Sequence, residues 1–398
     1  MRLFNTQSGA TELVTARDGA IGLYVCGVTP YDTTHMGHAF TFLTFDIVVR
    51  YLRYLEFAVT YVQNVTDIDD DILRKAKELG LKWDELGARE IEKYRNDMRG
   101  LNALDPDHYL RATDHVPEMI AIIEPLIASG FAYVVEGNVY FSVEKDPEFG
   151  KLSHIPVGEM LAIANERGNK PDDPNKRAPI DFLLWQAASP GEPTWPSPWG
   201  PGRPGWHIEC SAMATKYLGN TVDIHGGGAD LVFPHHECEI AQTENGTGAK
   251  PFVRYWMHVA MVKYQGEKMS KSLGNLVLAC DALEIYHPDA IRLYLFSHHY
   301  RASWEYLDEE VDEWSRLATD LREAVDFPAF GIEEVVDASV QRERFLLALD
   351  DDLDTPSAIE ALREISAAIL QAPEEEDIRD AQETLRELSA ILGLSLAD

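Results

Sequence analysis

His35-Met36-Gly37-His38 is the stretch that decides the fold, and it lies between an apolar run at residues 21–25 and a helical pattern at 39–55. This order predicts a strand, a loop and the first turn of a helix, a junction that offers backbone N–H groups to a phosphate. A second tract, Lys268-Met269-Ser270-Lys271-Ser272, follows another apolar run about 230 residues later. Its two lysines can close over the same phosphates. Together the tracts predict a nucleotide site.

The composition limits the class of protein. Its 398 residues suffice for two or three domains, and 45% are hydrophobic. No run of about 18 apolar residues predicts a membrane span, and the first ten residues lack the apolar core of a signal peptide. Four cysteines are too few for a disulfide scaffold. We therefore expect a cytoplasmic protein with reduced thiols and no membrane partner. The formal charge of −32 argues against broad attraction to nucleic acid but leaves a local basic patch open.

The order of patterns along the chain predicts an α/β fold. Strand-like runs at 22–26 and 58–64 flank the first helix, which indicates a βαβ unit. Helices are expected at 70–79, 83–101 and 115–129, a hairpin at 132–135 and 139–143, and helices at 308–327, 339–350, 355–371 and 376–392. A Pro-, Gly- and Asp-rich stretch at 145–205 indicates an insertion, after which sheet-like sequence resumes near Trp206. We expect two halves of a catalytic domain (1–112 and 201–305), a connective insertion (113–200) and a helical bundle (306–398).

Four side chains have the chemistry of a metal site. Cys26 ends the first strand, and Cys210 ends a tract that begins at Trp206. His235 and Glu239 are four residues apart, so they share one face of a helix. Two thiolates, an imidazole and a carboxylate suit Zn²⁺. Cys238, three residues from His235, is a rival fourth ligand, and buried structural cysteines with a surface histidine remain the alternative because the chain has no CxxC pair.

The two nucleotide tracts resemble the HIGH and KMSKS signatures of class I aminoacyl-tRNA synthetases. Cys26-Gly27, the Gly205-to-Cys210 tract and His235-His236-Glu237 are similar to the zinc-bearing positions of the cysteinyl-tRNA synthetase family. The resemblance implies a Rossmann-like parallel sheet with a connective insertion and a C-terminal α-helical bundle. It also implies that zinc, with Glu239 as fourth ligand, takes the thiolate of L-cysteine directly. Serine is then rejected because its hydroxyl is a poorer zinc ligand.

The same resemblance implies roles at the nucleotide site. His35 and His38 would donate to the phosphates of ATP, Lys268 and Lys271 would stabilise pyrophosphate, and Mg²⁺ would accompany ATP. Catalysis would then be positioning and charge stabilisation. Asp230, after the glycines 226–228, is the expected partner of the cysteine ammonium. The other expected ATP- and cysteine-binding residues are Cys26, Gly27, Val28, Thr29, Thr41, Asn64, Val65, Thr66, Trp206, Gly228, Ala229 and Val262.

The tracts resemble two branches of the family that transfer the cysteinyl group to different acceptors. Cys26-Gly27-Val28-Thr29-Pro30-Tyr31-Asp32 is closer to the mycothiol ligase branch than to a typical cysteinyl-tRNA synthetase, and the tracts 61–67 and 166–171 lean the same way. Residues 331–398 hold 18 acidic and 5 basic side chains, which would repel an anticodon stem. Glu239 and the tracts 221–230 and 235–242 resemble a tRNA synthetase instead. We expect an amide ligase that acts on the small amine glucosaminyl-inositol. The alternative charges tRNA-Cys without an anticodon-binding domain, and a non-catalytic binding module is a third possibility.

Overall fold

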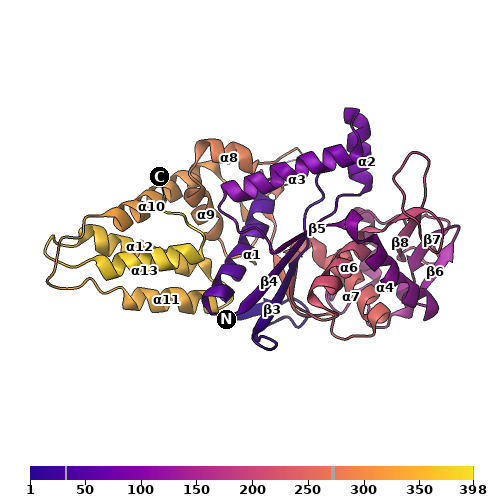
Figure 1. The fold of residues 1–398 in the computed structure, drawn as a ribbon, viewed down its shortest axis with the longest axis horizontal. Coiled ribbons are helices and arrows are strands. Elements are labelled where there is room, and N and C mark those ends of the chain that lie inside the picture. The colour runs from indigo at the N-terminus through magenta and orange to yellow at the C-terminus, as the bar shows by residue number, and fades with distance from the viewer. Residues whose placement is uncertain (32–33, 270–273, 398) are drawn as a thin grey trace.

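The protein is built around a parallel sheet, seen in the computed structural model, which describes residues 1–31, 34–269 and 274–397 (Figure 1). Its strands are β3 (Ala20–Val25), β4 (Ala58–Val65), β5 (His108–Arg111), β10 (Val222–Gly228) and β11 (Val253–Val259). They lie in the order β11-β10-β3-β4-β5, and every neighbouring pair is parallel. The predicted α/β fold is therefore confirmed.

Helix α1 (Met36–Tyr54) connects β3 to β4, so the predicted βαβ unit is present. The helix begins after His35, whose Nδ1 accepts a hydrogen bond from the backbone N–H of His38 at 3.3 Å. Its apolar residues occur on nearly every face, and Phe40, Leu43 and Phe45 are fully buried. A helix that is apolar all round belongs inside a large core, where α1 lies between the sheet and the C-terminal helices.

The next three helices form where the sequence predicts them, as α2 (Asp70–Leu79), α3 (Trp83–Gly100) and α4 (Val116–Ala128). Local signals set the ends of α2. The Asp69 side chain accepts from the N–H of Asp71 at 2.7 Å, and Gly80 takes the left-handed conformation with φ of 67°. In Figure 1, α2 and α3 lie above the sheet, on the side where β5 ends.

The stretch 145–205 is more ordered than its composition suggests. The predicted hairpin is confirmed as β6 (Ala132–Val135) and β7 (Asn138–Phe141), which β8 (Phe182–Ala187) and β9 (Gly202–Pro204) extend to a four-stranded antiparallel sheet. Helix α5 (Val157–Glu166) lies between β7 and β8 in sequence. The strands were missed because each is short and is stabilised by its pairing, not by a local pattern.

The prediction that sheet structure resumes near Trp206 is wrong. Helix α6 (Trp206–Leu218) begins there, and the next strand is β10. The tract has a strong mix of helix formers, and Gly219 ends the helix with φ of 84°. Cys210 therefore reaches the sheet from a helix. After β10 an irregular turn (Val232–His236) leads into α7 (Glu237–Thr247).

The last third of the chain is helical, as predicted. It holds α8 (Ala279–Ile285), α9 (Pro288–Phe296), α10 (Asp308–Asp326), α11 (Ser339–Asp350), α12 (Thr355–Gln371) and α13 (Arg379–Ile391). Helices α10 to α13 extend away from the parallel sheet at the left of Figure 1. Smaller strands are β1 (Arg2–Asn5), β2 (Ala10–Leu13), β12 (Val262–Tyr264), β13 (Glu267–Lys268) and β14 (Trp304–Glu305). Among the described helices, none combines the length and apolarity that crossing a membrane requires.

A buried arginine joins these helices to the sheet domain. Arg292 on α9 is completely buried and donates to Asp46 Oδ2 on α1 at 2.5 Å. Its other N–H groups reach the carbonyls of Leu101 at 2.9 Å and Leu392 at 2.8 Å. Asp46 also accepts from Arg50 Nε at 2.9 Å. We call this group the Arg292 hub, and each of its charged side chains has an oppositely charged partner.

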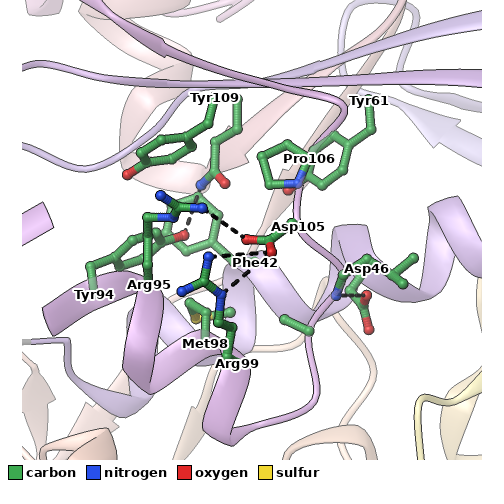
Figure 2. Close-up of a pocket in the computed structure, with 13 residues that line it drawn as sticks. Phe42, Asp46, Tyr61, Tyr94, Arg95, Met98, Arg99, Asp105, Pro106 and Tyr109 are labelled. Carbon is green, nitrogen blue, oxygen red and sulfur yellow. Dashed lines mark hydrogen bonds and ion pairs between the residues drawn. The ribbon is translucent and has the colours of Figure 1, made fainter. Parts of the chain in front are cut away.

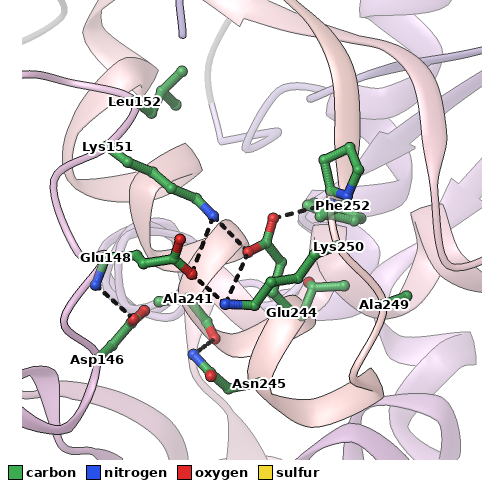
Figure 3. Close-up of polar contacts among 12 residues, drawn as sticks. Asp146, Glu148, Lys151, Leu152, Ala241, Glu244, Asn245, Ala249, Lys250 and Phe252 are labelled. Atoms are coloured by element: carbon green, nitrogen blue, oxygen red, sulfur yellow. Dashed lines mark hydrogen bonds and ion pairs between the residues drawn. The ribbon is translucent and has the colours of Figure 1, made fainter.

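A second ionic group fastens the insertion to α7 (Figure 3). Lys151 Nζ lies 2.5 Å from Glu244 Oε2 and 3.8 Å from Glu148 Oε2. Lys250 pairs with Glu148, and its Nζ is 3.9 Å from Glu244 Oε2. Glu244 Oε1 accepts the N–H of Phe252 at 3.1 Å. Because Glu239 is five residues earlier on α7, this group helps to fix the helix that presents it.

Candidate active site

The carboxyl ends of the parallel strands carry the residues that the sequence singles out. Cys26 follows β3 directly, and Asn64 and Val65 end β4. The glycines of β10 point the chain toward Asp230, which lies in a single 3-10 turn. In an open α/β sheet this edge is where ligands bind. The expected site therefore has a common location.

Cys26, Cys210, His235 and Glu239 meet at this edge, and we call them the metal cluster. Their ligand atoms all lie within 4.8 Å of one another, and all four residues are buried. Cys26 Sγ is 3.4 Å from Cys210 Sγ and 3.5 Å from Glu239 Oε1, and His235 Nε2 is 3.0 Å from Glu239 Oε1. Cys238 belongs to neither metal-ligating group found among the described residues. The geometry thus favours Glu239 over Cys238 as the fourth ligand.

His235 and Glu239 do not share a regular helix, which corrects the reason for expecting them together. His235 lies in the turn Val232–His236, where Phe233 has the extended angles φ −139° and ψ 136°. Glu239 lies in the first turn of α7. The two side chains still meet across the kink. The four-residue spacing therefore predicted the right contact, although the backbone between them is not a regular helix.

Three histidines that were not among the predicted ligands, His225, His236 and His258, lie beside the metal cluster, although the sequence analysis quoted His236 within a zinc-bearing tract. Cys26 Sγ is 3.3 Å from His236 Nε2 and 3.4 Å from His225 Nε2. His236 Nδ1 is 2.7 Å from His258 Nε2, so the contacts form a chain. Cys26, His225, His236 and Glu239 also satisfy metal-ligand geometry as a second, overlapping group. Sequence analysis could have found His225 and His258, because they lie on two neighbouring parallel strands that lead to the same edge of the sheet.

The metal cluster holds a buried carboxyl group, Glu239, that has no lysine or arginine partner among the described residues. Burial raises the pKa of the Glu239 carboxyl well above its usual range, and its ion-pair partners within the described residues are histidines only. Burial also lowers the pKa of His225 and His236 well below the usual range, so these rings are neutral at pH 7. In the described part of the chain, Glu239 Oε2 has no hydrogen-bond partner. A buried carboxylate without a cation is costly, so Glu239 is stable here either as the protonated acid or beside a positive ion, and the donor set fits such an ion.

The two thiols share their ionisation. Burial raises the pKa of Cys26, whose S–H donates to Cys210 Sγ at 3.4 Å. Burial is the largest influence on Cys210 and opposes its ionisation, but the hydrogen bond from Cys26 and the interaction with His235 together outweigh it and lower the pKa of Cys210 to about 7. The first negative charge therefore forms on Cys210. Two sulfurs, one imidazole and one carboxylate fit a borderline-soft divalent ion.

Several side chains that the sequence analysis expected at the amino-acid site have defined contacts. The Trp206 ring stacks on His235 with centroids 4.2 Å apart. Asn64 Oδ1 accepts the N–H of Gly27 at 2.9 Å, and Asn64 Nδ2 has no hydrogen-bond partner among the described residues. Only glycine fits at position 27, because a Cβ there would lie 1.6 Å from Asn64 O. The Thr66 hydroxyl donates to Glu209 Oε2 at 2.9 Å.

The glycines 226–228 are the last three residues of β10. Gly226 is paired with Met257 of β11, and a Cβ on it would lie 2.2 Å from the Phe45 ring. The glycine is thus required for close packing of β10 on α1. Ala229 and Asp230 follow in the turn, where the Asp230 carbonyl accepts from Arg167.

The histidines of the first nucleotide tract lie together. The rings of His35 and His38 stack with centroids 3.7 Å apart. The N–H of Met36 donates to Val277 O at 2.9 Å, which brings the chain just after the second tract against the first. Thr41 Oγ1 donates to Gly37 O at 3.1 Å, so its hydroxyl is engaged within α1.

The second tract is only partly described. Lys268 is exposed at the end of β13, and the N–H of Met269 donates to the buried Val262 at 3.2 Å. Lys271, Ser270 and Ser272 lie outside the described residues. The Val28 carbonyl accepts from Thr66 N at 3.1 Å, which joins the ends of β3 and β4, and the Thr29 carbonyl accepts from Tyr31 N at 3.1 Å.

A hollow behind this site is too small for the nucleotide (Figure 2). It lies between α1 and α3 and has a volume of about 20 Å³, which is room for about one water. Arg95 and Arg99 point to Asp105 across it, and Phe42 separates it from His38. The hollow is therefore not the substrate site.

Comparison with known proteins agrees with the geometry. Residues 12–316 match the family described as tRNA synthetases class I (C) catalytic domain, and residues 344–397 match the DALR domain. A cysteine–tRNA ligase of Dehalococcoides mccartyi is 45% identical over 100% of this chain and 87% of its own length. One from Legionella pneumophila is 45% identical over 100% of this chain and 86% of its own length.

Two further comparisons bear on acceptor and fold. The L-cysteine:1D-myo-inositol 2-amino-2-deoxy-alpha-D-glucopyranoside ligase of Frankia casuarinae is 47% identical over 91% of this chain and 77% of its own length. The solved methionyl-tRNA synthetase of Mycobacterium tuberculosis, in complex with methionyl-adenylate, has a TM-score of 0.67 at 16% identity, covering 94% of this chain and 89% of that one. The latter shows the fold alone. The chain therefore belongs to the family of class I tRNA synthetases with a (C)-type catalytic domain, and it is an ATP-dependent ligase.

Proposed function

We propose that this protein activates L-cysteine with ATP to cysteinyl adenylate and transfers the cysteinyl group to tRNA-Cys. The observation that carries the proposal is the match of cysteine–tRNA ligases to 100% of the chain. The buried metal cluster supports cysteine as the amino acid, because thiolates are preferred zinc ligands. The acceptor differs from the small amine favoured by the Cys26-to-Asp32 tract.

The proposed metal is Zn²⁺, held by Cys26, Cys210, His235 and Glu239. Bound there, it would supply a site for the thiolate of the substrate and so separate cysteine from serine. Burial of the four side chains excludes water from the ligands. The neutral His225 and His236 hold Cys26 Sγ in place from the other side.

The remaining residues position ATP and the substrate backbone. His35 and His38 at the start of α1 donate to the phosphates, where the positive end of the helix adds to their effect. Lys268 and Lys271 close on the pyrophosphate, with Mg²⁺ on ATP. Asp230 binds the cysteine ammonium. Binding of the nucleotide and amino acid further involves Gly27, Val28, Thr29, Thr41, Asn64, Val65, Thr66, Trp206, Gly228, Ala229 and Val262. In this proposal residues 1–112 and 201–305 are the catalytic halves, 113–200 the connective insertion and 306–398 the helical bundle.

Ion pairs between α2 and the segment 170–203 support a positioning role for the insertion. Asp70, the first residue of α2, pairs with Arg203 and lies 3.4 Å from Lys170 Nζ. Arg203 is buried and also contacts Glu192 at 3.3 Å. The contact ties α2 to β9 and to the loop after α5. It keeps the wall that carries Trp206 next to the strands that carry Asn64.

A second candidate acceptor is the amine of glucosaminyl-inositol. It is favoured by the 47% identity to the Frankia ligase and by the Cys26-to-Asp32 tract. The third possibility, a binding module without catalysis, is disfavoured because both nucleotide tracts are intact.

Two assays separate these functions. Cysteine-dependent ATP–pyrophosphate exchange by zinc-loaded protein tests activation, and we expect exchange with cysteine but not with serine. The same preparation is then given tRNA-Cys or glucosaminyl-inositol, with charged tRNA and AMP release as the readouts. Charging of tRNA supports the proposal. AMP release with the amino-sugar alone would transfer the assignment to the second candidate, and absence of exchange would leave only the binding module.

A further inference from the structure

The far end of the helical region presents apolar side chains to solvent. We call this surface the acidic apolar tip, and define it as the loops 327–338, between α10 and α11, and 372–378, between α12 and α13. Figure 1 shows both loops at the end of the helices farthest from the parallel sheet. Phe330 is 81% exposed, Ile332 83% and Val335 54%. Clustered exposure of large apolar groups is uncommon on a lone protein and marks interaction sites.

The two loops are joined to each other as a fixed platform. Four backbone hydrogen bonds of 2.7 to 3.1 Å link them. They run from Ile332 N and Glu333 N to Glu375 O, from Asp377 N to Glu334 O and from Val336 N to Asp377 O. Gly331 permits the close approach, since a Cβ there would lie 1.8 Å from Glu376 O. The exposed side chains are therefore displayed by a specific structure.

A buried amide fixes the base of the first loop. The side chain of Gln382 on α13 donates to the carbonyls of Ala324, Val325 and Phe327, at 2.9, 3.1 and 2.8 Å. These carbonyls lie at the C-terminal end of α10 and just after it, where backbone carbonyls lack the regular helical partners. The direction in which the loop leaves the helix is thus set by the bundle, and the platform needs no partner to hold its shape.

Between the loops lies a hollow of about 210 Å³. Its apolar walls are Phe327, Pro328, Phe330, Ala372, Pro373 and Ile378. A dry apolar cavity of about 150 Å³ accepts a benzene ring, so this hollow has room for one leucine or aromatic side chain. Glu374 and Glu376 line its edge.

The negative charge of the acidic apolar tip favours a positively charged partner. The two loops contain seven carboxylates (Glu333, Glu334, Asp337, Glu374, Glu375, Glu376 and Asp377) and no lysine or arginine. Just after the second loop, Arg379 pairs with Asp377 at 2.5 Å. A nucleic-acid backbone is repelled, and so is a second copy of a chain whose formal charge is −32. An apolar anchor flanked by lysine or arginine is complementary.

We propose that the acidic apolar tip binds a cationic amphipathic helix of another protein, which inserts one large apolar side chain between Phe330 and the loop at Pro373. The inference goes beyond the proposed function, because the tip is distant from the strands that carry the metal cluster. It concerns assembly of the enzyme with a protein partner, and it holds for either acceptor. Helix-in-groove recognition of this kind uses apolar anchors at i, i+3, i+4 and i+7.

The test uses the full chain and a fluorescein-labelled peptide of about 18 residues, with leucine at those positions and lysine elsewhere. Binding is measured by anisotropy at physiological ionic strength, where distant charges are screened. The double variant Phe330→Ser/Ile332→Ser removes the apolar anchors. Val157→Ser is the matched control, since Val157 is 81% exposed but lies on α5 in the insertion. Thermal unfolding checks that each variant folds as the parent does.

We expect the double variant to weaken peptide binding at least about tenfold, while Val157→Ser leaves it unchanged. A peptide with glutamate in place of lysine should not bind. Equal affinity of the parent and the double variant would overturn the proposal, because attraction would then come from net charge alone. Equal binding of the glutamate peptide would also overturn it. So would dimerisation of the parent that the double variant abolishes, since the occupant would then be a second copy.

Discussion

The metal cluster and the Arg292 hub are both buried groups of charged or ionisable side chains, but only the hub is complete by itself. In the hub, the guanidinium of Arg292 meets one carboxylate and two carbonyls at 2.5 to 2.9 Å. In the metal cluster, the carboxylate of Glu239 meets thiols and histidines, two of which burial keeps neutral. Burial alone therefore does not mark a functional site.

The difference gives a criterion for telling a structural group of buried charges from a functional one. A buried charge with a full set of partners contributes to the position of its helices, and it needs nothing from outside. A buried carboxyl whose partners leave its charge uncompensated either takes up a proton or receives a cation. The predictions below test this contrast.

The largest effect is expected for Glu239→Gln, which removes one negative charge from the metal cluster. Bound zinc per chain should fall toward zero, and cysteine-dependent pyrophosphate exchange should fall at least about 1,000-fold, or about 4 kcal/mol. Zinc is measured by atomic emission after gel filtration. Glu237→Gln is the matched control, because Glu237 accepts from the N–H groups of Gly150 and Ser153 and should keep its zinc. Full zinc occupancy in Glu239→Gln would remove that residue from the ligand set.

Asp46→Ala should be the most destabilising change in the hub. It leaves Arg292 buried without its carboxylate, so the free energy of unfolding should fall by about 3–5 kcal/mol. Urea unfolding followed by circular dichroism measures the loss. The double variant Asp46→Leu/Arg292→Met removes both charges and should recover most of it. If the single variant were as stable as the parent, the hub would not hold the helices together.

Addition of zinc to metal-free protein should raise its thermal midpoint. Zinc at about 100 times its Kd adds about 2.7 kcal/mol to the stability of the folded state. Differential scanning calorimetry should show the rise in the parent and in Asp46→Ala, but not in Glu239→Gln. A rise of the same size in Glu239→Gln would place the ion elsewhere.

Asp223 is an intermediate case, a buried carboxylate whose cations are partly in water. Burial opposes its ionisation, but hydrogen bonds from Arg17, Gly22 and Arg254 outweigh this and lower its pKa. Because the folded-state pKa is lower than the unfolded one, its stabilisation is present above the unfolded pKa and is lost as pH falls through the folded value. Asp223→Asn should cost about 1 kcal/mol at pH 7, and this difference should vanish toward pH 2. A pH-independent difference in urea unfolding would contradict the assignment.

Local patterns in the sequence predicted most of the fold. The βαβ unit, α2 and α3 and the four long C-terminal helices follow from periodicity and capping residues such as Asp69 and Gly80. The errors have a common physical cause, which is that contacts with distant segments, and not the local pattern, decide these elements. Strands β8 and β9 are defined by pairing with distant segments, and the tract at Trp206 became a helix although its neighbours on both sides are strands.

The candidate site was predictable in part. Cys26, Cys210, His235 and Glu239 could be selected by ligand chemistry, and the structure brings their ligand atoms together. His225 and His258 were missed, because each looks like an ordinary core histidine until β10 and β11 are aligned, and His236 was quoted in a tract but not predicted as a ligand. The acceptor could not be decided from short tracts, since the residues that contact the acceptor are not defined by the chemistry of cysteine activation.

The metal cluster draws one sulfur from a segment made early in synthesis and the other three donors from segments made much later. Cys26 and Cys210 are separated by 184 positions, and His235 and Glu239 follow still further along. A nascent chain that has been made only as far as residue 200 contains one of the four proposed ligands, Cys26. The proposed zinc site is therefore complete only after residue 239 has been made. A chain that ends before position 210 lacks three of the four proposed ligands.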